Sequence, residues 1–190
     1  MDRKIDIDTL NTAKNGNYTA YYLEFLDYEL KQKLKKNTHL KINEVYAYYR
    51  NNGTVSFSVF SDEGNECVAT QDIGGEYLSI PNDGKIKIIK PIKATFFRFF
   101  EVDNEILKVK KWYNSPSKEW YEDQNGVIEN DIIHYTTYYF SKKYKYEKKL
   151  LATTNKMNEK IVYQPNLKAV KYKNDNNTYF IITGEFNVKK

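Results

Sequence analysis

The sequence predicts a mainly β fold: an antiparallel sandwich, barrel or curved sheet of about eight to ten strands with one N-terminal amphipathic helix. Val, Ile and the aromatic residues number 56 of 190, whereas Leu, Ala and Met number 20. Branched and aromatic side chains fit a pleated, half-buried surface, so this ratio favours strands. From about residue 42 to residue 186, short apolar segments alternate with turn sequences. No linker divides the chain, and a single β-rich domain over residues 1–190 is expected.

The helix is expected at residues 18–36. An apolar stripe recurs every four residues, at Tyr18, Tyr22, Leu26, Leu30 and Leu34. This period places the stripe on one face of a helix. Asn17 is a suitable N-cap, and the lysine-rich end suits the negative end of the helix dipole. The aromatic-rich start also fits a strand, which remains the alternative.

After the helix the apolar period changes to two. The clearest hairpin joins residues 42–50 to residues 54–60 across Asn51-Asn52-Gly53, a strong turn sequence. Further strands are expected at residues 76–80, 85–92, 94–102, 106–113, 118–122, 127–140, 144–151, 160–164, 167–173 and 178–186. In this arrangement Asn125-Gly126 forms a turn between two strands.

Residues 94–102 are apolar on both faces, which predicts a central strand. Arg98 lies between Phe96 and Phe100 on one face, and Phe97 and Phe99 occupy the other. A guanidinium in this position must meet a carboxylate or stack on rings, so we expect a structural ion pair, with ligand anchoring as the alternative. The expected core is Val55, Phe57, Val59, Ile86, Ile88, Phe97, Phe99, Tyr139 and Ile181.

The tryptophan segment is the most specific feature of the sequence. Residues 106–113 and 118–124 can form a hairpin closed by residues 114–117, in which Trp112 opposes Glu119 and Tyr113 opposes Lys118. Trp112 and Tyr121 then share one face as diagonal neighbours, and Tyr113 and Trp120 share the other. One pair would be exposed, and exposed Trp and Tyr side chains suit protein partners and sugar rings. In the alternative arrangement both pairs are buried.

The positive charge is concentrated near the C-terminus. Formal net charge is +5 overall, but residues 135–190 carry 12 cations and 4 acids. Lys143, Lys145, Lys171 and Lys173, interleaved with tyrosines, suit an anionic polymer such as single-stranded nucleic acid. The chain has 27 Lys but only 3 Arg, so an A/T-rich genome and a solvated strand face explain the same residues.

No catalytic, metal-binding or cofactor-binding motif is present in the sequence. Cys67 is the single cysteine, which excludes an intramolecular disulfide and a multi-thiolate metal site. His39 and His134 pair with no motif, and the glycines form no phosphate-binding loop. Glu119, Glu122 and Asp123 near Trp120 could serve as a glycosidase pair of carboxylates, although chance clustering explains them equally well. We therefore expect no metal, no cofactor and no enzymatic activity, while a site assembled from distant strands remains the alternative.

We expect a non-enzymatic binding protein that acts through a protein–protein surface built from Trp112, Tyr113, Trp120, Tyr121 and Arg98. An immunity-type inhibitor of a toxin, an adaptor and an envelope component fit this description by analogy. Anionic-polymer binding by the lysines and carbohydrate binding by the Trp hairpin are the alternatives. No segment has the length and hydropathy of a membrane span or a signal peptide. This favours a cytoplasmic protein, and an exported protein whose signal has been removed is the alternative.

Overall fold

We analysed a computed structural model that describes residues 29–141, 155–174 and 177–188. The chain divides into two units, residues 1–36 and residues 37–190. In the first unit residues 29–36 form a short helix, as the second half of the predicted helix requires. The remainder of that prediction, with its N-cap at Asn17, lies outside the described residues. The predicted strand at residues 144–151 does so too.

The second unit is built from antiparallel strands, and the mainly β prediction is confirmed. Eleven strands are described rather than about eight to ten. They are β1 (Val45–Tyr49), β2 (Thr54–Phe60), β3 (Asn65–Asp72), β4 (Lys85–Lys87), β5 (Ile92–Asp103), β6 (Ile106–Ser115), β7 (Lys118–Glu129), β8 (Ile132–Ser141), β9 (Asn155–Tyr163), β10 (Leu167–Asn174) and β11 (Asn177–Asn187). The predicted hairpin across Asn51-Asn52-Gly53 is β1–β2, with Ala47 opposite Phe57.

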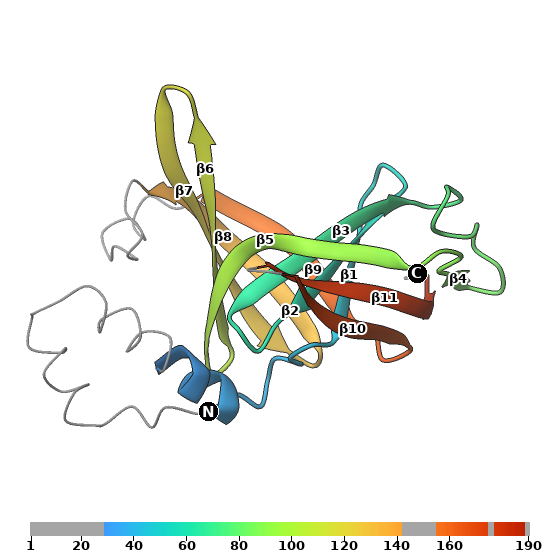
Figure 1. Ribbon diagram of the computed structural model, residues 1–190, viewed down its shortest axis with the longest axis horizontal. Helices are drawn as coiled ribbons and strands as arrows, with labels where there is room; N and C mark the ends of the chain where they lie inside the picture. The colour runs from blue at the N-terminus through green and yellow to red at the C-terminus, as the bar shows by residue number, and fades with distance from the viewer. Residues whose placement is uncertain (1–28, 142–154, 175–176, 189–190) are drawn as a thin grey trace, which may run out of the picture. The chain divides into compact units, whose positions relative to one another are not determined.

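Eight of these strands close into a barrel in the order β1-β2-β3-β5-β6-β7-β8-β9 (Figure 1). The pairs Tyr46–Tyr163 and Ala47–Val162 join β9 back to β1 and complete the circle. β5 is long enough to serve two partners on one of its edges. Its C-terminal half pairs with β6, and its N-terminal half pairs with β11, where β11, β10 and β4 branch from the barrel.

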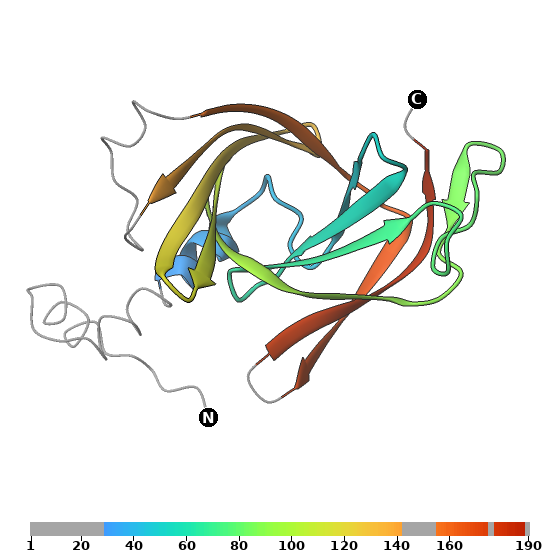
Figure 2. The same ribbon diagram turned by 90° about the horizontal axis from the view of Figure 1, so that it is seen from above.

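The branch creates a second, apolar core on the outer face of β1, β2 and β3. Val55, Phe57 and Val59 of β2 point into this core and meet Phe180 and Ile182 of β11. The intervening β2 side chains point into the barrel. Both faces of β2 are therefore covered, which explains why the strand is buried from its second residue to its last. Seen from above, β6–β8 and β10–β11 lie on opposite sides of β2 and β3 (Figure 2).

A glycine that resembles a turn signal lies instead within a strand. β7 runs without a break through Asn125 and Gly126, and the chain turns at Asn130-Asp131, where both residues have positive φ. Gly126 lies directly opposite Tyr135 of β8, at a shift in register. The glycine leaves room for the Tyr135 ring, so the predicted turn at Asn125-Gly126 is wrong for a reason of packing. The predicted strand at residues 76–80 is also absent, and Leu78 forms only isolated bridges.

The predicted core is partly correct. Val55, Phe57, Val59, Ile86, Ile88 and Tyr139 are buried, whereas Phe97 and Phe99 are exposed and Ile181 is half-buried. The β3–β5 register explains the error on β5, because Glu66 opposes Arg98 and Cys67 opposes Phe96. Phe97 is an extra residue in this ladder and breaks the alternation. Arg98 and Phe100 point inward, but Phe96 does not share their buried environment.

Candidate functional site

The interior of the barrel is filled at one end. Tyr46, Phe60 and Phe100 form a chain of ring contacts there, with centroids 5.7 Å and 5.2 Å apart. Leu107 and Ile133 complete this plug, and all five side chains are buried. Eight-stranded barrels hold either packed side chains or one small ligand, and this end holds side chains.

At the other end the inward-facing side chains are only partly covered. Tyr113, Trp120, Glu122 and Gln124 continue the inner faces of β6 and β7, and each is half-buried. Phe140 of β8 lies at the same end and is 54% exposed. We call this region the open end of the barrel. The open end therefore presents aromatic and polar side chains that are partly accessible to solvent.

A buried ion pair forms the floor of the open end. The Arg98 guanidinium of β5 donates two hydrogen bonds to the Glu66 carboxylate of β3. Its Nη2 also donates to the Tyr135 hydroxyl at 3.0 Å, so Arg98 links β3, β5 and β8 across the interior. Burial lowers the Arg98 pKa, but Glu66, Tyr135 and Glu122 together outweigh this effect, and the pKa lies above its ordinary value. The expected structural ion pair of Arg98 is therefore confirmed.

A chain of hydrogen bonds leads from this floor to the rim. Arg98 Nη1 donates to Gln124 Oε1 at 2.6 Å, and Gln124 Nε2 donates to Glu122 Oε1 at 2.7 Å. Tyr113 donates its hydroxyl proton to Glu122 Oε2 at 3.1 Å. Each carboxylate oxygen of Glu122 is thus held by one protein donor and keeps a further lone pair. We call Glu66, Arg98, Gln124, Glu122 and Tyr113 the lumen network.

Lys111 lies beside the lumen network at the open end. Its Nζ is 3.8 Å from the centroid of the Phe97 ring and 4.7 Å from that of Tyr113. Burial lowers the Lys111 pKa, and the positive charge of Arg98 lowers it further against the opposing effect of Glu122. Among the described residues, no acceptor lies within hydrogen-bonding distance of this ammonium group. Its N–H groups are therefore available at the rim.

The aromatic residues of the hairpin lie on the predicted faces but in a different register. Trp112 lies directly opposite Tyr121, and Tyr113 directly opposite Trp120, because the turn contains two residues rather than four. Tyr113 and Trp120 face inward and stack with their centroids 5.3 Å apart and their planes 6° apart. The predicted opposition of Trp112 to Glu119 is wrong, although the Trp112 indole donates to Glu119 Oε1 at 3.0 Å.

The outer face of the hairpin carries exposed aromatic side chains. Trp112 is 48% exposed, and Phe99 on β5 is 41% exposed. Phe99 lies opposite Lys110, which is two residues before Trp112 on β6, so Phe99 and Trp112 are diagonal neighbours on the same face. Phe96 is 44% exposed and contacts Phe99 with ring centroids 5.0 Å apart. Diagonal cross-strand neighbours of this size are within reach of each other. We call Phe96, Phe99 and Trp112 the outer aromatic patch.

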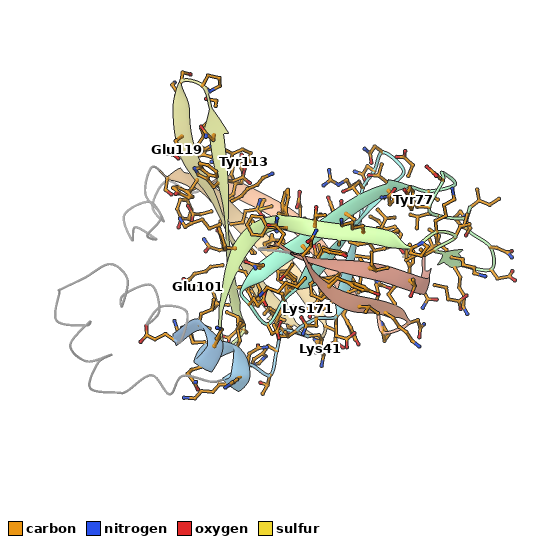
Figure 3. All side chains as sticks on the ribbon, in the orientation of Figure 1. Lys41, Tyr77, Glu101, Tyr113, Glu119 and Lys171 are labelled. Atoms are coloured by element: carbon orange, nitrogen blue, oxygen red, sulfur yellow. The ribbon has the colours of Figure 1, made fainter. Side chains whose placement is uncertain are left out.

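Within the described residues, the hairpin extends beyond its pairing with β5 and β8. Pairing of β6 with β5 ends at Lys110–Phe99, and described pairing of β7 with β8 ends at Tyr121–Ser141. The tip, which carries Tyr113 and Glu119, therefore projects from the barrel (Figure 3). A buried ion pair anchors its base, where Lys110 Nζ lies 2.5 Å from Asp123 Oδ1.

Two of the four lysines predicted for polyanion binding are engaged in ion pairs. Lys171 Nζ lies 2.6 Å from Asp62 Oδ1 and 3.2 Å from Glu63 Oε1, and Lys173 Nζ lies 3.3 Å from Glu63 Oε1. These carboxylates offset the local positive charge. Lys143 and Lys145 lie outside the described residues. Lys171 also lies on a different part of the unit from Tyr113 (Figure 3).

Neither a metal-binding cluster nor a helix that could span a membrane is found in the described part of the chain. Within residues 29–141, 155–174 and 177–188, no group of three or more His, Cys, Asp or Glu side chains is arranged to hold a metal ion. His134 shares a 2.7 Å hydrogen bond with Asn158. In the same ranges, no helix has both the length and the apolar character needed to cross a membrane.

Comparison with known proteins identifies no relative: no protein family, curated protein or solved structure matches the chain. The function of the site is therefore inferred from its geometry.

The sequence predicted Arg98, Tyr113 and Trp120 as residues of a partner surface and Glu122 as one of three carboxylates that could serve a glycosidase, but it did not indicate that these residues and Gln124 lie together. The sequence could have placed Glu122 and Gln124 on the same strand face as Trp120, because the three residues are two positions apart along one strand. Glu66 and Tyr135 could not have been assigned from the sequence, since Glu66 meets Arg98 only through the pairing of β3 with β5, and Tyr135 meets it only across the interior of the barrel.

Proposed function

We propose that the protein is a non-enzymatic binding protein that engages a partner protein through the outer aromatic patch and the projecting β6–β7 hairpin. The observation that carries the proposal is the exposure of Trp112, Phe99 and Phe96, each more than 40% exposed, beside a hairpin that extends past its neighbours. Large aromatic side chains supply most of the binding free energy at many protein interfaces. Contiguous exposed apolar patches of this kind are typical of interaction sites.

The hairpin suits a protein partner for a second reason. Residues 111–115 of β6 extend past the last residue of β5 that pairs with β6, so this length of strand offers an edge beside the patch. An extended segment of a partner can form main-chain hydrogen bonds with such an edge. Toxin-neutralising immunity proteins, adaptors and envelope components are classes that act by surface binding, and the first remains our preferred member by analogy.

Not every residue expected at a partner surface supports this role. Arg98 is buried in the lumen network, and Tyr113 and Trp120 face the open end. Of the residues expected from the sequence, the partner surface therefore keeps only Trp112 and Tyr121, which share one face, and the structure adds Phe96 and Phe99. The four lysines of the polyanion alternative contribute no part of it.

The test compares three forms of the full chain as bait in an extract of the cells that produce it: wild type, Trp112→Ala, and Tyr172→Ala. Tyr172 is a matched control, because it is 46% exposed but lies on β10, away from the hairpin. We expect one protein to co-purify with the wild type and the control but not with Trp112→Ala. Titration with that purified protein should show a loss of about 2 kcal/mol or more, roughly thirtyfold in Kd. A partner that binds Trp112→Ala as tightly as wild type, or the absence of any protein that distinguishes the baits, would contradict the proposal.

A further inference from the structure

We propose that the open end of the barrel is a second binding site, on the opposite face of the hairpin, for a neutral carbohydrate: a single sugar unit or the end of an oligosaccharide. The site comprises Trp120, Tyr113, Glu122, Lys111 and Gln124. It is independent of the partner surface, because Trp112 and Tyr121 point away from it.

The shape of the barrel favours a small ligand at this position. Eight-stranded barrels have an interior wide enough for one such molecule. Here the plug around Phe60 and Phe100 fills one end, whereas Tyr113, Glu122 and Gln124 at the other end are half-buried and keep part of their surface in contact with solvent. Ligand sites of this type combine aromatic walls with a few well-placed polar groups.

The polar groups are held in place before any ligand arrives. Glu122 is fixed through both carboxylate oxygens, by Tyr113 at 3.1 Å and Gln124 at 2.7 Å, and Gln124 is fixed by Arg98 at 2.6 Å. Arg98 is in turn held by Glu66. A rim carboxylate ordered by such a chain can accept hydrogen bonds from ligand hydroxyl groups at little cost in side-chain entropy.

The donor side of the site is Lys111. Its ammonium lies between the Phe97 and Tyr113 rings, at 3.8 Å and 4.7 Å from their centroids, and has no described hydrogen-bond acceptor. A sugar offers hydroxyl and ring oxygens as acceptors and hydroxyl protons as donors. It can therefore satisfy Lys111 and Glu122 at once.

Aromatic rings at the same rim supply the apolar contact. Trp120 stacks on Tyr113 and is itself half-buried, so the pair forms a rigid surface at the open end. The C–H face of a sugar ring packs well on such a surface.

Charge balance indicates a neutral sugar rather than an ion. Two carboxylates, Glu66 and Glu122, accompany two cations, Arg98 and Lys111, at the site. The Glu66–Arg98 pair is already satisfied, and Glu122 would repel an anion that approached Lys111. A ligand with balanced donors and acceptors and no net charge meets no such penalty.

The two tryptophans of the chain permit a direct test, because each can be made the only fluorescent indole. Trp112→Phe leaves Trp120 as the reporter of the open end, and Trp120→Phe leaves Trp112 as the reporter of the outer face. Each protein is titrated to millimolar concentration with maltose, cellobiose, lactose and N,N′-diacetylchitobiose, and with glucuronate as the acidic probe. We expect a saturable change in Trp120 emission with at least one neutral sugar and none in Trp112 emission.

Calorimetric titration with that sugar then assigns the contacts. Glu122→Gln and Lys111→Met should each weaken binding about tenfold or more, since each removes a hydrogen bond to a charged group. Trp112→Phe should bind as wild type does. Circular dichroism and urea midpoints check that the variants are folded, and both substituted side chains lie at the rim, where substitution is tolerated best.

Three results would overturn the proposal. One is the absence of any change in Trp120 emission and of any binding heat with all four neutral sugars. A second is binding of glucuronate alone, which would indicate an anion site at Lys111. A third is an equal response from Trp112, which would move the site to the outer face. None of these results bears on partner binding, which Trp112→Ala tests separately.

Discussion

Gly126 lies directly opposite Tyr135 across β7 and β8, and Tyr135 Cδ1 is 3.1 Å from the position that a Cβ atom at residue 126 would occupy. The backbone oxygen of His134 and a methyl carbon of Ile133 are each 3.3 Å from the same position. The absence of a side chain at residue 126 therefore leaves room for the Tyr135 ring, whose hydroxyl accepts a hydrogen bond from Arg98.

We expect Gly126→Ala to destabilise the protein by about 1–3 kcal/mol, because the added methyl overpacks this contact. Urea denaturation measures the change. Tyr135→Val should relieve the crowding, so the cost of Gly126→Ala should fall in that background and the two substitutions should be non-additive. Additive costs would mean that Gly126 is required for its backbone rather than for the Tyr135 ring.

The Arg98–Glu66 pair gives a second prediction. Arg98→Met should cost about 3–5 kcal/mol, because it leaves the Glu66 carboxylate buried without its cation. Glu66→Met should be costly for the converse reason, because it leaves the Arg98 guanidinium buried without its carboxylate. The double variant Arg98→Met, Glu66→Met should cost less than the sum of the single changes, since both charges are then removed. Denaturant titration of the four proteins checks this, and simple additivity would show that the two side chains are not coupled.

A third prediction compares a buried phenylalanine of β2, Phe57, with an exposed one of β5, Phe99. Phe57 is fully buried in the core between β2 and β11, so Phe57→Ala should cost about 3–5 kcal/mol. Phe99 is 41% exposed, and Phe99→Ala should cost about 1 kcal/mol or less. Thermal or urea unfolding of both variants measures the difference. A cost at Phe99 equal to that at Phe57 would show that β5 is covered on its outer face.

Glu63 gives a prediction about pH. The Thr178 hydroxyl donates to Glu63 Oε2 at 2.6 Å, and with Lys171 and Lys173 it lowers the pKa of Glu63 from 4.5 to about 2. A carboxyl group with a depressed pKa in the folded state stabilises that state above its unfolded pKa, and this stabilisation is lost as pH falls through the folded pKa. Wild type should therefore be more stable than Glu63→Gln at pH 7, and the difference should shrink as pH falls from about 4.5 towards 2.

The measurement is the unfolding free energy of wild type and Glu63→Gln between pH 7 and pH 3. Glu101→Gln is the control for the removal of a carboxylate from the surface, because Glu101 is exposed on β5. A difference at Glu63 that stays constant over the range would indicate that its charge is not responsible.

Much of the fold could be predicted because strand signals are local. Alternation in residues 54–60, the Asn51-Asn52-Gly53 turn and the excess of branched and aromatic residues were sufficient for a mainly β fold and for the first hairpin. The faces of Trp112, Tyr113, Trp120 and Tyr121 also followed from alternation, although their register did not. The turn is shorter than predicted by two residues, and a shift of two residues leaves each side chain on the same face of the strand. The faces of the four aromatic residues were therefore predicted correctly, whereas the residues opposite them were not.

The candidate site was predictable only in part. Arg98 stood out because a guanidinium on an apolar strand must be paired, and that argument is local. Its partners come from three other strands, and no pattern along the chain indicates which carboxylate or hydroxyl will be opposite it.

The sequence by itself determined the strand content, the first hairpin, the alternation of the Trp hairpin and the need of Arg98 for a partner. The tertiary structure decided that β9 returns to β1 and closes the barrel, and that β5 divides its length between β6 and β11. It also decided that Gly126 makes room for Tyr135 instead of forming a turn. The physical reason is the same in each case: propensity and alternation act between near neighbours in the chain, whereas closure, register shifts and buried charge pairs depend on residues that meet only when distant strands pack together.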